Sequence, residues 1–171
     1  MNVPALAETA LPIYEVRLLR APGSTPEISI WQMPARATPH IREPLRLGGL
    51  AGRNLELVEH RVLRRLAATG LRADYAPAAT RTARGHALDE QTALRLALLF
   101  RALAPMRDRT RMRAVAEGIE AMGREEAAYW LGMTLHRPNP RRVLTALRYL
   151  LTDPAPPHQA PGPFPGPAPA Q

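Results

Sequence analysis

The chain has 171 residues and a formal net charge of +8, because its 23 basic residues, all of them arginine, outnumber 15 acids. It contains no cysteine, which excludes disulfides, thiolate zinc sites and cysteine nucleophiles. No run approaches the ~20 apolar residues that span a bilayer, and the first dozen residues lack the order of a secretory signal, so we expect a cytoplasmic protein without membrane contact.

The N-terminal part predicts a flexible arm followed by a β-hairpin. Residues 1–12 show no sustained period and are expected to be the arm. Two runs rich in β-forming residues, within 13–33, are joined by Pro, Gly and Ser, which form turns. In the second run Ile28 and Ile30 alternate with Glu27 and Ser29, as a half-buried strand requires. One face of the hairpin over residues 13–33 must therefore be covered.

Residues 34–52 hold three prolines and the string LGGLAG, and they predict either a third strand or a turn directly before a helix. The glycines of this string resemble the hairpin of helix-hairpin-helix DNA-binding proteins, whose backbone amides hold a phosphate. Their spacing is one residue longer than in that motif, and the preceding segment is not helical in pattern. The alternative is a turn that lets the chain approach the sheet closely.

Helical periodicity starts at Asn54, which we expect to cap the first helix. A long loop is expected over residues 71–87. Asn139 predicts the start of the last helix, with Pro140 at its first position. The expected helices cover about residues 54–69, 89–104, 108–122, 124–136 and 140–152. The predicted class is α+β, with an N-terminal β-hairpin, or three strands, packed on a bundle of about five α-helices in one domain over 13–152.

The C-terminal segment, residues 153–171, is expected to be disordered. Its last eighteen residues contain eight prolines, which cannot donate the backbone hydrogen bonds of regular structure. The segment is therefore interpreted as a partly polyproline tail.

No arrangement of residues predicts a reaction. Glu56 and His60 are four apart on one helix face, a spacing that fits a simple polar contact better than a metal site. A group of glutamates between 117 and 126 lies near helix ends, where the helix dipole explains it. No nucleophile elbow, phosphate loop or dinucleotide motif is present. We therefore assign no catalytic residue, no metal and no cofactor, and expect a noncatalytic protein.

The first of two arginine groups crowds the start of the third expected helix. At that end the helix dipole disfavours positive charge, and neighbouring cations repel one another. Asp108, Glu117 or a carboxylate from another helix would relieve this repulsion, and so would a phosphate or an acidic partner. The group consists of Arg107, Arg109, Arg111 and Arg113.

The second arginine group surrounds the last helix and the loop before it. It consists of Arg137, Arg141, Arg142 and Arg148. Arg141 and Arg148 are seven residues apart and are expected to share an exposed face opposite the leucines. This face is either a solubilising surface or a binding surface for nucleic acid or an acidic protein. The nearby aromatics are interpreted as core or boundary residues and not as platforms for stacked bases: Tyr129, Trp130 and Tyr149.

Residues 123–154, GREEAAYWLGMTLHRPNPRRVLTALRYLLTDP, resemble the C-terminal part of a small uncharacterised bacterial domain family associated with DNA-modification and phage-defence gene clusters. The resemblance implies a partner within a DNA-handling assembly and assigns no catalytic residues. The leading hypothesis is a noncatalytic accessory or adaptor subunit that docks through its arginine-rich helical surface on DNA, RNA or a larger protein. The alternatives are a protein–protein adaptor that uses the hairpin or the proline tail without nucleic-acid contact, and an enzyme of unknown class.

Overall fold

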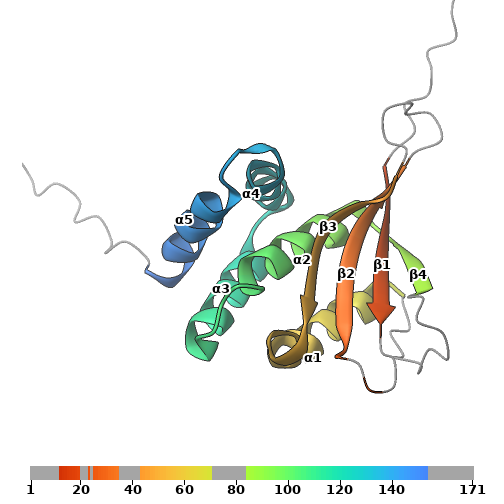
Figure 1. The fold of residues 1–171 in the computed structure, drawn as a ribbon, viewed down its shortest axis with the longest axis horizontal. Helices are drawn as coiled ribbons and strands as arrows, with labels where there is room; N and C mark the ends of the chain where they lie inside the picture. Colours follow the sequence, from red (N-terminus) through yellow and green to blue (C-terminus); the bar gives the residue numbers. More distant parts are fainter. Residues whose placement is uncertain (1–11, 20–22, 24, 35–42, 71–83, 154–171) are drawn as a thin grey trace, which may run out of the picture.

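The structure is a computed structural model that describes residues 12–19, 23, 25–34, 43–70 and 84–153, and it shows an α+β fold (Figure 1). The strands are β1 (Ile13–Leu19), β2 (Glu27–Met33), β3 (Leu45–Ala51) and β4 (Arg84–Leu88). The helices are α1 (Gly52–Ala68), α2 (Glu90–Leu103), α3 (Arg109–Ala121), α4 (Arg124–His136) and α5 (Pro140–Thr152). The expected N-terminal arm and proline-rich tail fall almost entirely outside the described residues.

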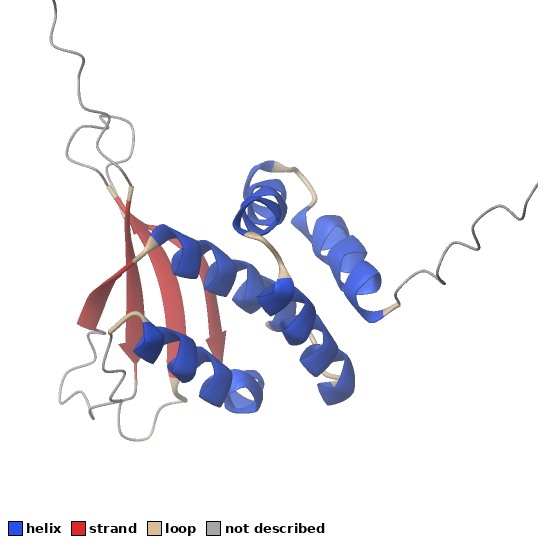
Figure 2. Ribbon diagram, turned by 180° about the vertical axis from the view of Figure 1, so that it is seen from behind, coloured by secondary structure: helices blue, strands red, loops and turns tan. Residues whose placement is uncertain are grey.

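The four strands form one antiparallel sheet in the order β3-β2-β1-β4. The predicted hairpin is the β1–β2 pair, in which Val16 lies opposite Ile30 and Leu18 opposite Ile28. Val16, Ile28 and Ile30 are fully buried. Helices α1 and α2 cover the face of the sheet that carries these three side chains (Figure 2). The alternation in the sequence therefore reflects a sheet with one covered face.

The glycine-rich string is a strand and not a hairpin between helices, so the comparison with helix-hairpin-helix proteins is wrong. Gly48 pairs with Ile30 and Gly49 with Ser29 in the β2–β3 ladder. A Cβ atom on Gly48 would lie 2.7 Å from the carbonyl oxygen of Ala97 in α2. The glycine therefore allows β3 and α2 to pack closely. The alternative of a turn is wrong as well, because the segment is a strand of the sheet and its close neighbour is a helix.

The loop expected over residues 71–87 is wrong at its C-terminal end, where β4 begins. This strand has the sequence RGHAL and pairs with β1, with Val16 opposite His86 and Tyr14 opposite Leu88. Glycine and alanine have low β propensity, so the segment carries little local signal. Its strand conformation comes from pairing with a segment about seventy residues away in the chain.

Helix α2 lies at the centre of the molecule, between the sheet on one side and α3, α4 and α5 on the other (Figure 1). It is buried at most positions, and Leu98 and Phe100 are completely so. Full burial of one such side chain stabilises the fold by about 1.5–3 kcal/mol. The fold is thus a sheet, a layer of α1 and α2, and an outer layer of three helices that carries the predicted arginine groups.

Each of the five helices begins and ends within two residues of its expected range. Asp89, Asp108 and Asn139 are N-caps whose side chains accept backbone hydrogen bonds. The expected cap at Asn54 is wrong, because α1 starts at Gly52, whose φ of +61° suits glycine.

Asn54 instead joins two helices. Its Nδ2 donates to the carbonyl oxygens of Leu103, Ala104 and Met106, at distances of 3.0, 3.1 and 3.1 Å. These carbonyls lie at the end of α2 and in the turn that follows it. The first turn of α1 is therefore held at the C-terminal end of α2.

Candidate anion-binding surface on α3 and α5

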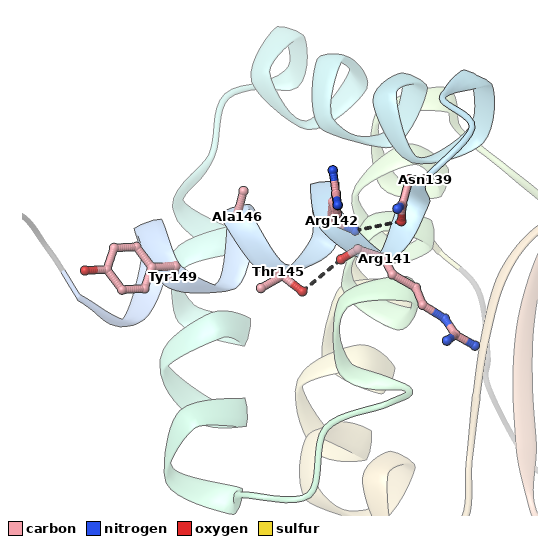
Figure 3. A pocket seen from close by; sticks show the side chains of 6 residues that line it. All are labelled: Asn139, Arg141, Arg142, Thr145, Ala146 and Tyr149. Carbon is pink, nitrogen blue, oxygen red and sulfur yellow. Dashed lines mark hydrogen bonds between the residues drawn. The ribbon is translucent and has the colours of Figure 1, made fainter.

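Two adjoining hollows lie along the outer side of α5. The larger has a volume of about 590 Å³ (Figure 3) and is lined by Asn139, Arg141, Arg142, Thr145, Ala146 and Tyr149. The smaller has a volume of about 280 Å³ and is lined by Pro105, Met106, Arg107, Asp108, Arg111, Thr145, Arg148 and Tyr149. Because Thr145 and Tyr149 line both, the two hollows adjoin at these side chains. We call the arginines around them, together with Thr145 and Tyr149, the α3–α5 surface.

The structure divides the first predicted arginine group between two sides of α3. Successive residues of an α-helix are rotated by about 100°, so Arg109 and Arg113 project away from Arg111. Arg107, in the turn before α3, and Arg111 line the smaller hollow, and Arg109 and Arg113 line neither hollow. Arg137 of the second group also lies outside both hollows.

The acids expected to neutralise the α3 arginines are engaged elsewhere. The Asp108 carboxylate accepts the backbone N–H groups of Thr110 and Arg111, at 2.9 and 3.2 Å. Glu117 accepts a hydrogen bond from Arg61 of α1 at 3.0 Å. Among the described residues, no ion pair involves any arginine of the two predicted groups. Asp108 is thus the single acid that lines hollows bordered by five arginines.

Arg148 is half-buried, so the expectation that it is exposed beside Arg141 is wrong. Its Nε donates to the carbonyl oxygen of Ala102 at 2.9 Å. Burial lowers the pKa of Arg148, and the charge of Arg111 lowers it further. A cation near the end of α2 interacts favourably with the helix dipole. Arg148 therefore stabilises the packing of α5 on α2 while it lines the smaller hollow.

Arg141 and Arg142 leave the first turn of α5 in different directions and are both exposed (Figure 3). Asn139 accepts the backbone N–H of Arg142 at 3.3 Å, and the Thr145 hydroxyl donates to the Arg141 carbonyl oxygen at 2.8 Å. These bonds fix the start of the helix that carries both guanidinium groups. Pro140 adds to this, because its φ angle is already helical.

Tyr149 and Tyr129 are exposed at 61% and 60%, so their interpretation as core or boundary residues is wrong. The Tyr129 ring packs edge-on against Trp130, which is half-buried. Tyr149 projects from α5 beside the hollows, and a hydrogen bond with the Asp153 carboxylate raises the pKa of its hydroxyl. The leucines along α5 predict one buried face for the whole helix. In the second half of the helix this face is only partly covered, and Leu150 is 59% exposed.

Sequence reasoning missed a second basic hollow, between α1 and α3. It has a volume of about 700 Å³ and is lined by His60, Arg61, Arg64, Arg65, Ala68 and Glu120. Arg61 bridges Glu117 and Glu120, at 3.0 and 3.1 Å, and an Arg64 guanidinium nitrogen lies 2.7 Å from His60 Nε2. The sequence does contain a signal for this cluster, because its basic residues recur every three to four positions along α1 and so share one helix face. Its charge, unlike that of the α3–α5 surface, is partly compensated by ion pairs.

Over the described ranges, no group of three or more histidine, aspartate or glutamate side chains is placed to hold a metal ion. The helices described are all too short or too polar to cross a membrane.

Comparison with known proteins gives a family. The model of a domain of unknown function (DUF7680) matches residues 14–153, which run from β1 to the end of α5. No curated protein and no solved structure matches the chain. The match includes the sheet, all five described helices and both hollows, and on this basis the chain belongs to the DUF7680 family.

Proposed function

We propose that the chain is a noncatalytic accessory subunit that binds nucleic acid through the α3–α5 surface. One observation carries the proposal. Five arginines from α3, α5 and the turn before α3 surround two adjoining hollows, while Asp108 and Glu117 are engaged with backbone N–H groups or with α1. The protein brings these cations together without supplying an equal number of carboxylates.

A phosphate suits this arrangement for two reasons. A guanidinium group presents its N–H donors in a planar fork that can bind two oxygens of one phosphate. An anion between Arg111 and Arg148 would also offset the repulsion that contributes to the lowered pKa of Arg148. The formal charge of +8 adds a long-range attraction for polyanions.

The cellular setting that we propose is a bacterial, cytoplasmic DNA-handling assembly that includes a larger protein. The resemblance of residues 123–154 to a family associated with DNA-modification and phage-defence genes supports this setting. It includes all of α4 and all of α5, the helix that carries Arg141, Arg142 and Arg148. In such an assembly the chain would supply contact with the nucleic-acid backbone and leave the chemistry to its partner.

Binding measured across a salt series tests the proposal. Fluorescence anisotropy with labelled duplex and single-stranded oligonucleotides should show binding at low salt that weakens steeply as salt rises. Release of counterions by about four or five phosphate contacts predicts a slope of log affinity against log salt near −4 for duplex DNA. Negligible affinity for both forms at low salt would show that the protein does not bind nucleic acid directly.

A second candidate, protein docking without nucleic acid, is favoured by the outer face of the sheet. None of the described helices covers this face, on which the Arg17 guanidinium lies 4.4 Å from the centre of the Trp31 ring. Trp31 also donates to the Ser29 hydroxyl at 2.9 Å. Co-purification from the native host of the wild type and a Trp31→Ala variant tests this candidate. It requires that a partner be recovered with the wild type and lost with the variant.

A further inference from the structure

We propose that the α3–α5 surface takes nucleic acid as a single strand, with a base stacked on Tyr149 and the backbone phosphates held by the surrounding arginines. This inference rests on the proposed function and specifies the form of nucleic acid that the surface binds. It assigns a role to an exposed aromatic residue that the sequence alone did not single out as a platform.

Tyr149 has the exposure and the position that a stacking platform needs. Its side chain is 61% exposed and borders both hollows. Over the described residues the one close aromatic pair is Tyr129 with Trp130, so the Tyr149 ring is not occupied by another ring. A tyrosine side chain has few rotatable bonds, so it loses little conformational entropy when a base stacks on it.

The two hollows differ in the chemistry that they offer. The larger is walled mostly by carbon atoms, and Arg141 and Arg142 are among the residues that line it. Such a hollow suits the apolar face of a base next to its phosphates. The smaller is more polar and is bordered by Arg107, Arg111 and Arg148, which suits a phosphate.

The side-by-side position of the two hollows matches the alternation of base and phosphate along a strand. Thr145 and Tyr149 lie at the junction, so a base against Tyr149 would place its neighbouring phosphates among the arginines on either side. In a duplex the base faces are already stacked on one another and cannot reach the ring. A duplex would therefore use the arginines alone, and a single strand would use the arginines and the ring.

The basic hollow between α1 and α3 is a weaker candidate for the same ligand. Arg61 there is already paired with Glu117 and Glu120. No tyrosine, tryptophan or phenylalanine lines that hollow, and the one ring there, that of His60, is in contact with the Arg64 guanidinium at 2.7 Å. It offers partly compensated charge and a smaller ring that is already engaged.

Two substitutions at Tyr149 separate stacking from charge. The full chain is titrated by fluorescence anisotropy with labelled oligo(dT), oligo(U) and a duplex of equal length at one salt concentration. Tyr149→Leu keeps an apolar side chain without the ring, and Tyr149→Phe keeps the ring without the hydroxyl. Because Tyr149 is exposed, both variants should fold, which circular dichroism and the urea midpoint verify.

We expect Tyr149→Leu to lower single-strand affinity about tenfold and to leave duplex affinity within about twofold, because loss of one stacked base has an effect of that size. Tyr149→Phe should remain within about threefold of the wild type on all ligands. A preference between oligo(dT) and oligo(U) would support the inference and identify the strand as DNA or RNA.

Three results would overturn the inference. Unchanged single-strand affinity in Tyr149→Leu would show that no base stacks on the ring, and an equal loss on duplex would show a general effect on binding. A loss in Tyr149→Phe equal to that in Tyr149→Leu would assign the effect to the hydroxyl. In each case arginine-dependent binding persists and the proposed function stands. Absence of binding to all three ligands at low salt would remove both.

Discussion

The Nε–H group of Arg148 donates a hydrogen bond to the carbonyl oxygen of Ala102 at 2.9 Å, which joins α5 to the C-terminal end of α2. Asn54 donates to Leu103 at the same end from α1. Two helices are thus anchored on carbonyls at the C-terminal end of α2. One arginine of the α3–α5 surface therefore also holds the helices together, and its substitution affects stability as well as binding.

Arg148→Met should destabilise the protein, because the methionine keeps much of the apolar stem but leaves the Ala102 carbonyl without its donor. We expect the free energy of unfolding to fall by about 1–2 kcal/mol, as measured by urea denaturation. Arg141→Met removes the same charge at an exposed position and should change stability by less than about 0.5 kcal/mol. Equal effects of the two substitutions would show that the bond to Ala102 contributes nothing.

Gly48→Ala should weaken the contact between the sheet and α2. The new Cβ would lie 2.7 Å from the backbone oxygen of Ala97, so β3 or α2 must move. Overpacking of this kind costs about 1–3 kcal/mol, measurable as a lower urea midpoint. Gly132→Ala in α4 is the control, since its Cβ meets no atom within 4 Å. It should stabilise the protein by about 0.5–1 kcal/mol through helix propensity, and a stabilising Gly48→Ala would contradict the close packing.

Stability should depend on Tyr14 at alkaline pH. Burial raises the pKa of Tyr14 above its ordinary value of 10.0, and the charge of Glu90 raises it further. As pH rises above about 10, the unfolded chain loses this proton first, so the free energy of unfolding falls until the folded pKa is passed. Urea denaturation at pH 9, 10 and 11 should show a smaller fall in Tyr14→Phe than in the wild type. Identical falls would mean that Tyr14 titrates alike in both states.

The helices were predictable because their signals are local. Asp89, Asp108 and Asn139 begin helices by accepting hydrogen bonds from residues two or three positions later. Strand β4 was not predictable, because a segment with Gly85 and Ala87 becomes a strand only through its pairing with β1. Tertiary pairing decided the structure where local propensity was weak.

The candidate site was predictable in composition but not in arrangement. The helical period alone separates Arg111 from Arg109 and Arg113, a division that grouping by sequence position overlooks. The half-buried position of Arg148 depends on where α2 ends, which no local pattern in α5 reveals. Exposure of Tyr149 likewise depends on how much of α5 the neighbouring helices cover.

The central claim, that the α3–α5 surface binds nucleic acid, is tested most directly by a matched pair of charge reversals on α3. Arg111→Glu and Arg113→Glu change the net charge equally at exposed positions of one helix, but only Arg111 lines a hollow. At about 0.1 M salt, loss of one phosphate contact predicts at least about a tenfold fall in affinity for Arg111→Glu and no more than about threefold for Arg113→Glu. Equal losses in the two variants, or a larger loss in Arg113→Glu, would contradict the claim.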